Sequence, residues 1–273
     1  MRIATMWRYP IKSMLGEPIT AAHLDTAGLE RDRELALIDA ATGLVATAKH
    51  PRLWRGLLQF SAAVDGDEVV ISAPAGWTAA SHSPGIDGRL SEALGRPVRL
   101  AGERPDAATV ERPDPEDVLA HGVEAEVAAP TTQIGAGSPG ATFVDHSPVH
   151  IVTSATLDGI GVDQVRYRPN LVVETEPGTD AFVENGWVGH ELHVGAEVVL
   201  RVMLPTPRCA VPTLEHGLLG RAPDAVRTLM RENRIDVPGF GMLPCAGCYA
   251  VVVRPGVVQV GDRVTVDGPL IQP

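Results

Sequence analysis

Apolar residues in the first hundred positions form short runs separated by turn residues, and this pattern is typical of a β-rich unit. Asp and Gly stand together at Asp39 to Gly43 and again at Asp65 to Asp67, which predicts hairpin turns. Residues 87–94 differ, because their apolar positions recur every three or four residues and Gly95 follows, so we expect a short helix there. The strands predicted for this region are residues 2–7, 19–24, 35–38, 54–64, 68–72 and 98–100.

The pattern breaks at residues 102–141, which are rich in Ala, Pro, Gly, Glu and Asp and almost free of aromatic residues. We expect this segment to be a linker or a mobile lid. Its low hydrophobicity predicts that its acidic side chains form a solvated face. These side chains are Glu103, Asp106, Glu111, Asp114, Glu116, Asp117, Glu124 and Glu126.

A globular pattern returns in residues 142–273. Helices are expected from Thr153 or Ser154 to Gly159 and over residues 222–233. The sequence thus predicts a mainly β protein with a few helices, built from an N-terminal unit at 1–101 and a C-terminal unit at 142–273. Neither a Gly-x-Gly-x-x-Gly motif nor a phosphate-binding P-loop occurs, which disfavours a nucleotide-binding fold. The strands predicted here are residues 149–152, 170–175, 191–194, 198–203, 249–253 and 263–266.

Charge and composition narrow the functional classes. With 23 Lys and Arg against 34 Asp and Glu, the net charge of −11 disfavours a general nucleic-acid binder. The first residues contain no apolar signal region, and the longest uncharged stretches are broken by Pro and Gly, so no membrane association is expected. The odd count of three Cys does not match a secreted disulfide framework, and we predict a cytoplasmic location.

Cys209 is the first candidate for chemistry. It follows an apolar strand and lies among Pro205, Pro207 and Pro212, which predicts a rigid loop at the end of that strand. The adjacent Arg208 would favour the thiolate, which is the form that ligates metals and attacks electrophiles. A buried, inert cysteine is the alternative, since free Cys often packs as a small apolar residue.

Cys245 and Cys248 have the Cys-x-x-Cys spacing of redox pairs and zinc sites. The residues from Tyr249 to Arg254 predict a strand, however, whereas thioredoxin-like sites continue into a helix. We expect Cys245, which follows Pro244, to lie in a loop before this strand, and strand alternation to point Cys248 away from the face of Tyr249. Zinc would need a fourth ligand, such as His216, at no standard spacing. An incidental pair, a redox pair and a structural zinc site therefore all stay open.

Eight short motifs follow one another along the chain in an order that resembles a known protein family. They are Tyr9-Pro-Ile-Lys12-Ser13, Gly28-Leu29 with Asp32-Arg33, His50-Pro-Arg-Leu53, Asp145-x-Ser147-Pro148, Tyr167-Arg168-Pro169-Asn170, Ala181-Phe-Val-Glu-Asn-Gly-Trp187, Arg208-Cys209 and Val260-Gly261-Asp262. Their order resembles the MOSC superfamily, which is named after the C-terminal domain of molybdenum cofactor sulfurase and includes the amidoxime reducing component and the YcbX-like proteins. The chain departs from the family pattern at Ala246, where an aromatic residue is usual, at His146, where Ser or Thr is common, and at Lys49, near a usual Arg.

The resemblance implies a MOSC N-terminal β-barrel domain followed by a MOSC β-barrel that holds molybdenum on a molybdopterin. Cys209 would be the metal ligand, and a soft thiolate does suit such a metal. Pyridoxal phosphate binding is a further property attributed to the family. The resemblance assigns the cofactor's phosphate and pterin to Lys12, Ser13, Arg33, Asp145, Ser147, Arg168, Asn170 and Arg208, with Tyr249 at the end of the site.

The activity implied is reduction of small N-hydroxylated, N–O-containing substrates by oxygen-atom transfer to molybdenum. Asp145 and His146 would relay protons, and Cys209 would hold the metal. No cysteine set for an iron–sulfur cluster occurs, so we expect a separate electron-donor protein of the ferredoxin or flavoprotein type. Two alternatives stay open: a sulfur-carrier or cofactor-delivery protein with a persulfide on Cys209, and a degenerate barrel that binds neither.

Overall fold

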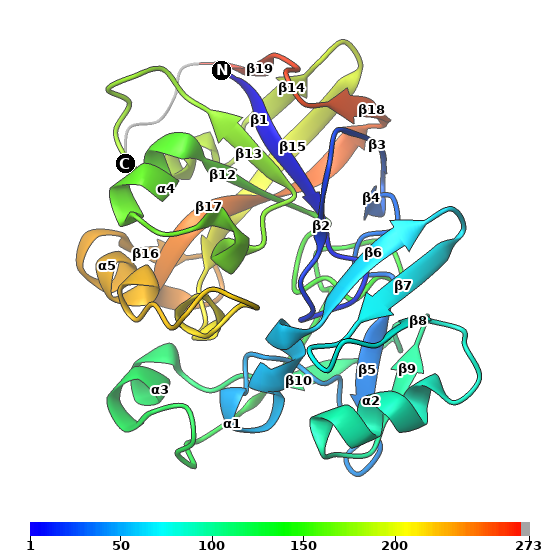
Figure 1. The fold of residues 1–273 in the computed structure, drawn as a ribbon. Coiled ribbons are helices and arrows are strands. Elements are labelled where there is room, and N and C mark those ends of the chain that lie inside the picture. Colours follow the sequence, from blue (N-terminus) through cyan, green and yellow to red (C-terminus); the bar gives the residue numbers. More distant parts are fainter. Residues whose placement is uncertain (269–273) are drawn as a thin grey trace.

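The computed structural model describes residues 1–268 and is organised around one nine-stranded mixed sheet (Figure 1). Its strands run in the order β19-β14-β15-β17-β12-β13-β1-β2, and β16 pairs with β17 beside this path. The strands are β1 (Arg2–Arg8), β2 (Glu17–Ile19), β12 (Val149–Thr153), β13 (Leu171–Glu174), β14 (Glu191–Val194), β15 (Val198–Pro207), β16 (Arg234–Val237), β17 (Gly241–Arg254) and β19 (Val264–Val266).

Helices and short helical turns surround this sheet. Helix α4 (Ser154–Ile160) joins the parallel strands β12 and β13, and Thr153 caps it by accepting a hydrogen bond from the Thr156 amide. The other elements here are α5 (Asp224–Glu232), η2 (Gln164–Tyr167), η3 (Val183–Trp187) and η4 (Val211–Thr213). Apolar residues of the sheet, including Ile3, Met6, Ile151 and Leu200, form a core together with Trp187 of η3. Burial of this surface is the main term that stabilises the sheet.

Three smaller sheets complete the N-terminal part. They consist of β3 (Ala21–Asp25), β4 (Gly28–Leu29) and β18 (Gly256–Gln259), then β5 (Ala36–Asp39) with β9 (Val98–Ala101), and β6 (Ser61–Asp65) with β7 (Glu68–Ser72) and β8 (Thr78–Ala80). Helix α2 (Ile86–Leu94) packs here through Leu90, in a second core with Trp54, Phe60 and Ile71. This core is separate from that of the large sheet.

Strands from the two ends of the sequence pair with each other. Met6 of β1 lies opposite Leu171 of β13, and Leu24 of β3 lies opposite Gly256 of β18. The sheets therefore cross the boundary between the predicted units at 1–101 and 142–273, of which residues 269–273 lie outside the described part. This pairing between N-terminal and C-terminal strands brings N-terminal loops next to the ends of C-terminal strands.

The predicted mainly β fold is confirmed, and one predicted strand is wrong. Residues 51–59 form helix α1 (Pro51–Trp54) and turn η1 (Arg55–Gln59), and only β6 belongs to the expected strand at 54–64. Trp54, Leu57 and Leu58 are buried at a spacing of three and four residues, which is the helical period. Within residues 1–268, no helix combines the length and the hydropathy needed to cross a membrane.

The acidic segment 102–141 carries ordered elements, namely β10 (Thr109–Glu111), α3 (Pro115–His121) and β11 (Thr131–Gln133). Val110 and Ile134 anchor it in a core with Phe143. Its acidic side chains are exposed as expected, except for the half-buried Glu111, whose carboxylate lies 2.8 Å from His50 Nδ1. The idea that this segment moves as a lid stays a prediction.

Candidate functional site

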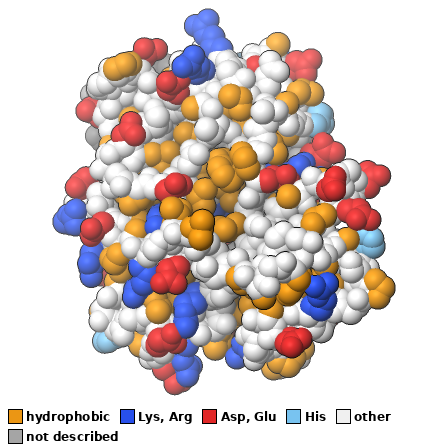
Figure 2. Space-filling view, in the orientation of Figure 1, with side chains coloured by type: hydrophobic (Ala, Val, Ile, Leu, Met, Phe, Trp, Pro, Cys, Tyr) orange, Lys and Arg blue, Asp and Glu red, His pale blue; other side chains and the backbone are white. Residues whose placement is uncertain are grey.

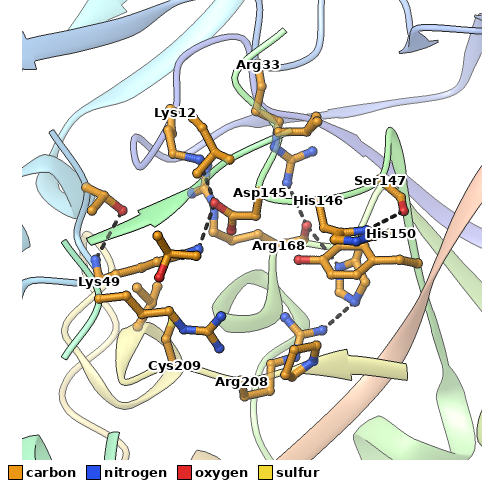
Figure 3. A pocket seen from close by; sticks show the side chains of 18 of the residues that line it. Lys12, Arg33, Lys49, Asp145, His146, Ser147, His150, Arg168, Arg208 and Cys209 are labelled. Atoms are coloured by element: carbon orange, nitrogen blue, oxygen red, sulfur yellow. Dashed lines mark hydrogen bonds and ion pairs between the residues drawn. The ribbon is translucent and has the colours of Figure 1, made fainter. Parts of the chain in front are cut away.

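One pocket lies where the N-terminal loops, the acidic segment and the ends of the C-terminal strands meet (Figure 3). It brings together every side chain to which the sequence assigned a role, although these residues are spread over more than two hundred positions. They are Lys12, Ser13, Arg33, Asp145, His146, Ser147, Arg168, Asn170, Arg208, Cys209 and Tyr249.

Cys209 lies directly after β15 and lines the pocket with 9% of its surface exposed. The loop that follows it is held by the buried Arg166, which donates to the carbonyl oxygens of Leu214 at 2.8 Å and Gly220 at 2.6 Å. The expected loop at the strand end is therefore present, and the hydrogen bonds of Arg166 hold it in place.

The prolines before Cys209 do not end the strand as expected. Strand β15 continues to Pro207 and pairs with β17, with register shifts near Pro205 and Pro207. Strand β14 pairs with β15 only over residues 198–201, so the proline-containing end is an edge. Edges and bulges are the places in a sheet that tolerate proline, which has no N–H to donate.

Arg208 is buried and held by three groups. Its Nε donates to Ala246 O at 2.9 Å, its Nη1 donates to Tyr167 O at 3.1 Å, and its Nη2 bonds to His150 Nε2 (Figure 3). Burial, reinforced by Arg208, lowers the pKa of His150 well below its usual value, so the ring is neutral and accepts from the guanidinium. Arg208 thus has a fixed orientation beside the Cys209 loop.

Gly247 makes room for this arrangement. Its φ is +76°, and an added Cβ would lie 2.4 Å from Ile151 O and 2.6 Å from His150 Nε2. Glu184 accepts a hydrogen bond from the Gly247 amide at 3.1 Å and from the hydroxyls of Thr153 and Thr156 at 2.8 Å. Glu184 is completely buried, and burial raises its pKa. The motif at 181–187 therefore supports the β17 backbone that carries the Arg208 acceptor.

Asp145 lies between two lysines on the opposite side of the pocket (Figure 3). Its Oδ1 is 2.6 Å from Lys12 Nζ and 2.8 Å from Lys49 Nζ. Burial raises the pKa of this carboxyl. The combined attraction of the two ammonium groups outweighs burial and holds the pKa well below its usual range. Burial also lowers the pKa of Lys12 to about 8. The carboxylate thus stays ionised at neutral pH.

A stack of charged and aromatic groups joins the two parts of the chain. The guanidinium groups of Arg33 and Arg168 lie 4.5 and 4.4 Å from the ring centroid of the buried Tyr9. Arg33 donates to Arg168 O at 3.0 Å and is ion-paired with Asp32. Within residues 1–268, the buried Arg168 Nη2 has no hydrogen-bond partner. An unmet buried donor of this kind calls for an acceptor in the pocket.

Three pocket residues have left-handed backbone conformations that favour glycine, namely Ser13, Arg33 and Arg168, with φ values of +66°, +49° and +54°. Such strain often marks functional sites. The hydroxyl of Ser13 accepts from the Ala48 amide at 3.1 Å, which ties the first loop to the turn that contains Lys49.

The remaining predicted residues, Tyr249, His146, Ser147 and Asn170, also line the pocket, and they differ in the contacts that they make. Tyr249 stacks on His146 with 5.9 Å between ring centroids, and His146 Nδ1 lies 2.9 Å from Ser147 Oγ. Asn170 instead uses its amide on the backbone, accepting from the His150 amide at 3.0 Å and donating to Trp7 O at 3.4 Å. Asn170 therefore fastens β12, β13 and β1 together.

Sequence reasoning assigned no role to Lys49, His150 or Arg112, which also line the pocket. Lys49 directly precedes the His50 motif, which is a signal that could have identified it. His150 lies inside a buried strand and resembles an ordinary core residue. Arg112 belongs to the acidic segment that was predicted to be only a linker or lid.

Cys245 and Cys248 both lie inside strand β17, so the expectation of a loop before the strand at Cys245 is wrong. Both side chains are completely buried free thiols. Burial raises the pKa of Cys245 to about 12 and that of Cys248 well above its usual value. The expected direction of Cys248, away from the pocket-lining Tyr249, agrees with its place in the core of the large sheet.

The chain is similar to known proteins over nearly its whole length. Human mitochondrial amidoxime-reducing component 1 is 27% identical over 96% of this chain and 82% of its own length. Mitochondrial amidoxime reducing component 2 of Macaca fascicularis is 26% identical over the same shares of the two chains. Among solved structures, the YUAD protein from Bacillus subtilis aligns over 97% of this chain and 94% of its own with 10% identity and a TM-score of 0.44.

Two family patterns match consecutive regions of the sequence. The MOSC N-terminal beta barrel domain matches residues 1–95, and the MOSC domain matches residues 139–265. The order of these two matches is the one that the eight motifs predicted. The chain therefore belongs to the MOSC superfamily, with a MOSC N-terminal beta barrel domain followed by a MOSC domain.

Proposed function

We propose that this protein is a reductase of N-hydroxylated compounds that uses a molybdenum cofactor, with Cys209 as the protein's metal ligand. The observation that carries the proposal is the convergence of one pocket-lining thiol, that of Cys209, and a group of cations on a single pocket. The relatives named amidoxime-reducing components support the substrate class. Their names describe those proteins, and the activity is inferred for this chain.

The residues present fit a phosphate-bearing cofactor held through a thiolate. Asp145 is the one carboxylate lining the described pocket, whereas its lysines and arginines are Lys12, Arg33, Lys49, Arg112, Arg166, Arg168 and Arg208. This excess of positive charge favours an anion, in a chain whose net charge is −11. The unmet donor of Arg168 offers a charge-assisted hydrogen bond. A cysteine thiolate is the soft ligand that such a metal prefers.

Each part of the pocket then has a role in binding or proton transfer. Lys12 and Lys49 would hold the phosphate, and Asp145 keeps their ammonium groups together when the pocket is empty. When bound, the cofactor supplies the two-electron oxygen-atom chemistry. Burial lowers the pKa of His146, so this half-buried ring is neutral and able to accept a proton near the pocket. Lys12, with a pKa of about 8, is a better acid than the permanently ionised Asp145.

The test is the metal content of protein expressed in a host that makes the cofactor. We expect about one molybdenum per chain in the wild type and a loss of about ten-fold or more in Cys209→Ala. The matched control is the pair Cys245→Ala with Cys248→Ala, which should keep the metal because both thiols lie outside the pocket. Reduction of benzamidoxime with an artificial electron donor should follow the metal content.

Two results would contradict this assignment. Wild-type protein without molybdenum and pterin, prepared from a competent host, would count against the cofactor. Loss of metal from the Cys245 and Cys248 variant, with retention in Cys209→Ala, would move the metal to the Cys-x-x-Cys pair.

The sulfur-carrier alternative uses the same pocket-lining thiol and predicts a different product. After incubation with a cysteine desulfurase, Cys209 would carry one additional sulfur atom, detectable by mass spectrometry. A relay through Cys245 and Cys248 is disfavoured, because both thiols are completely buried and thiol exchange needs access to the attacking sulfur.

A separate electron-donor protein of the ferredoxin or flavoprotein type is part of the proposal. Charged side chains of both signs surround the edge of the face drawn in Figure 2, and hydrophobic ones gather along its middle. With a net charge of −11, association with a basic donor should slow as salt rises. The cytoplasmic location and pyridoxal phosphate binding stay predictions of the sequence.

A further inference from the structure

The pocket has a second wall that is uncharged and aromatic. His146 lies between two rings, stacked on Tyr249 at 5.9 Å and meeting the edge of Phe240 at 6.1 Å with an interplanar angle of 74°. All three residues line the pocket. Because burial lowers the pKa of His146, its ring is neutral at physiological pH, and this aromatic wall carries no charge.

Phe240 is presented by a short hairpin turn between β16 and β17. The Phe240 amide donates to Val237 O at 2.8 Å, with Pro238 and Gly239 at the centre of the turn. Gly239 has a φ of +80°, and proline followed by such a glycine is typical of a type II turn. The Pro-Gly sequence restricts the backbone of the turn that presents Phe240 at the pocket.

Two large apolar side chains are exposed on this hairpin, Phe240 at 43% and Met242 at 54%. Phe240 lines the pocket, while Met242 is not among the residues that line it. An exposed ring beside two further rings, which it meets edge-on at His146, offers an apolar, aromatic surface to a bound molecule. The neighbouring Met242 provides an exposed apolar residue of the same hairpin for comparison.

We propose that Phe240 determines substrate specificity by packing its exposed ring against the planar aromatic part of an N-oxygenated substrate, beside the His146–Tyr249 pair. This inference rests on the proposed function and specifies its substrate class. The basic wall would hold the anionic cofactor, which leaves the aromatic wall for the neutral substrate. Aromatic amidoximes and other planar aromatic N-hydroxylated compounds fit this surface better than aliphatic ones.

The test compares benzamidoxime and acetamidoxime, which share the reacting group and differ in the ring. Loss of a ring–ring contact costs a few-fold to about ten-fold in binding, so Phe240→Ala should lower the ratio of kcat/KM for the two compounds by about five-fold. The change should appear in KM for benzamidoxime. Phe240→Tyr should keep the wild-type ratio, and so should Met242→Ala, which removes the other exposed residue.

Binding provides a readout that does not need turnover. Isothermal titration of benzamidoxime should give a Kd about five-fold higher for Phe240→Ala than for the wild type and for Met242→Ala. An unchanged ratio and an unchanged Kd in Phe240→Ala would overturn the inference, as would an equal loss in Met242→Ala. If metal-loaded wild-type protein reduces neither compound, the proposed function fails, while the Kd comparison still decides whether Phe240 binds the aromatic ring.

Discussion

The two faces of strand β17 border different environments, a cationic pocket on one side and an apolar core on the other, and each contains a cysteine and a carboxylate. Tyr249 lines the cationic pocket, which also contains Cys209 and Asp145. One residue earlier, Cys248 lies in the apolar core of the large sheet, near the buried Glu184. Successive side chains of a strand point to opposite faces, so a single step along the chain separates the pocket from the core.

Carboxylates show the consequence of this difference. Asp145 has two ammonium groups within 2.8 Å, and they hold its pKa below the usual range. Glu184 has only neutral donors, the two threonine hydroxyls and the Gly247 amide, and burial raises its pKa. Residue type alone therefore does not determine the charge state of a buried carboxyl group. The cations that face a side chain decide whether it stays charged.

The largest expected difference concerns thiol reactivity. In native protein without cofactor, iodoacetamide should modify Cys209 at least about 100-fold faster than Cys245 or Cys248, since the buried thiols react only after local opening. Mass spectrometry of peptides over time measures the three rates. Full unfolding in guanidinium is the control and should bring the rates together. Equal rates in the native protein would contradict the distinction between pocket and core.

A smaller effect is expected on stability. Cys248→Ser places a hydroxyl in the apolar core, and an unpaired buried hydroxyl costs about 1–3 kcal/mol in the free energy of unfolding. Cys245→Ser should cost less, because Cys245 Sγ donates to Leu243 O at 3.4 Å and serine can keep that bond. Cys209→Ser, at the pocket, should change stability by less than about 1 kcal/mol. Urea unfolding checks the order, and the reverse order would refute it.

The smallest effect is the pH dependence of the two carboxylates. Asp145 has a lowered pKa in the folded state, so its contribution to stability is present above the unfolded value of 3.8 and is lost as the pH falls below it. Glu184 has a raised pKa, so its contribution is present below 4.5 and is lost as the pH rises through the folded value.

We therefore compare the free energy of unfolding of the wild type with that of Asp145→Asn and with that of Glu184→Gln. These two differences should change with pH in opposite senses. Each slope is at most about 1.4 kcal/mol per pH unit, the value for one proton. Urea unfolding between pH 3 and 8 measures both slopes. Slopes of the same sign would show that the two faces of β17 do not differ electrostatically.

Much of this site was predictable from the sequence because its residues stand in short motifs next to turns. Lys12, Asp145 and Arg168 were recognised in this way, and the structure brings them into one pocket. The roles within the motifs were less predictable. Asn170 lines the pocket as expected and in addition bonds to backbone groups of neighbouring strands, and that second role depends on strand pairing.

Errors arose where local sequence supports two conformations. The apolar run at 54–64 suits a strand, yet the spacing of Trp54, Leu57 and Leu58 lets a helical turn bury all three, the first two in the N-terminal core and Leu58 in a cluster with Cys209. Cys245 follows Pro244, which suggested a loop, but pairing with Pro207 extends β17 through it. Packing of side chains into a core decided the conformation in the first case, and long-range strand pairing decided it in the second.

The sequence by itself determined the mainly β class, the superfamily and the thiol that follows a strand, since these depend on residue type and order. Only the tertiary structure decided which face each side chain occupies and which charges surround it. Arg112 and His150 became pocket residues through contacts between segments far apart in the chain. Burial and the distance between charges set the pKa of each group, and neither quantity exists until the strands have paired.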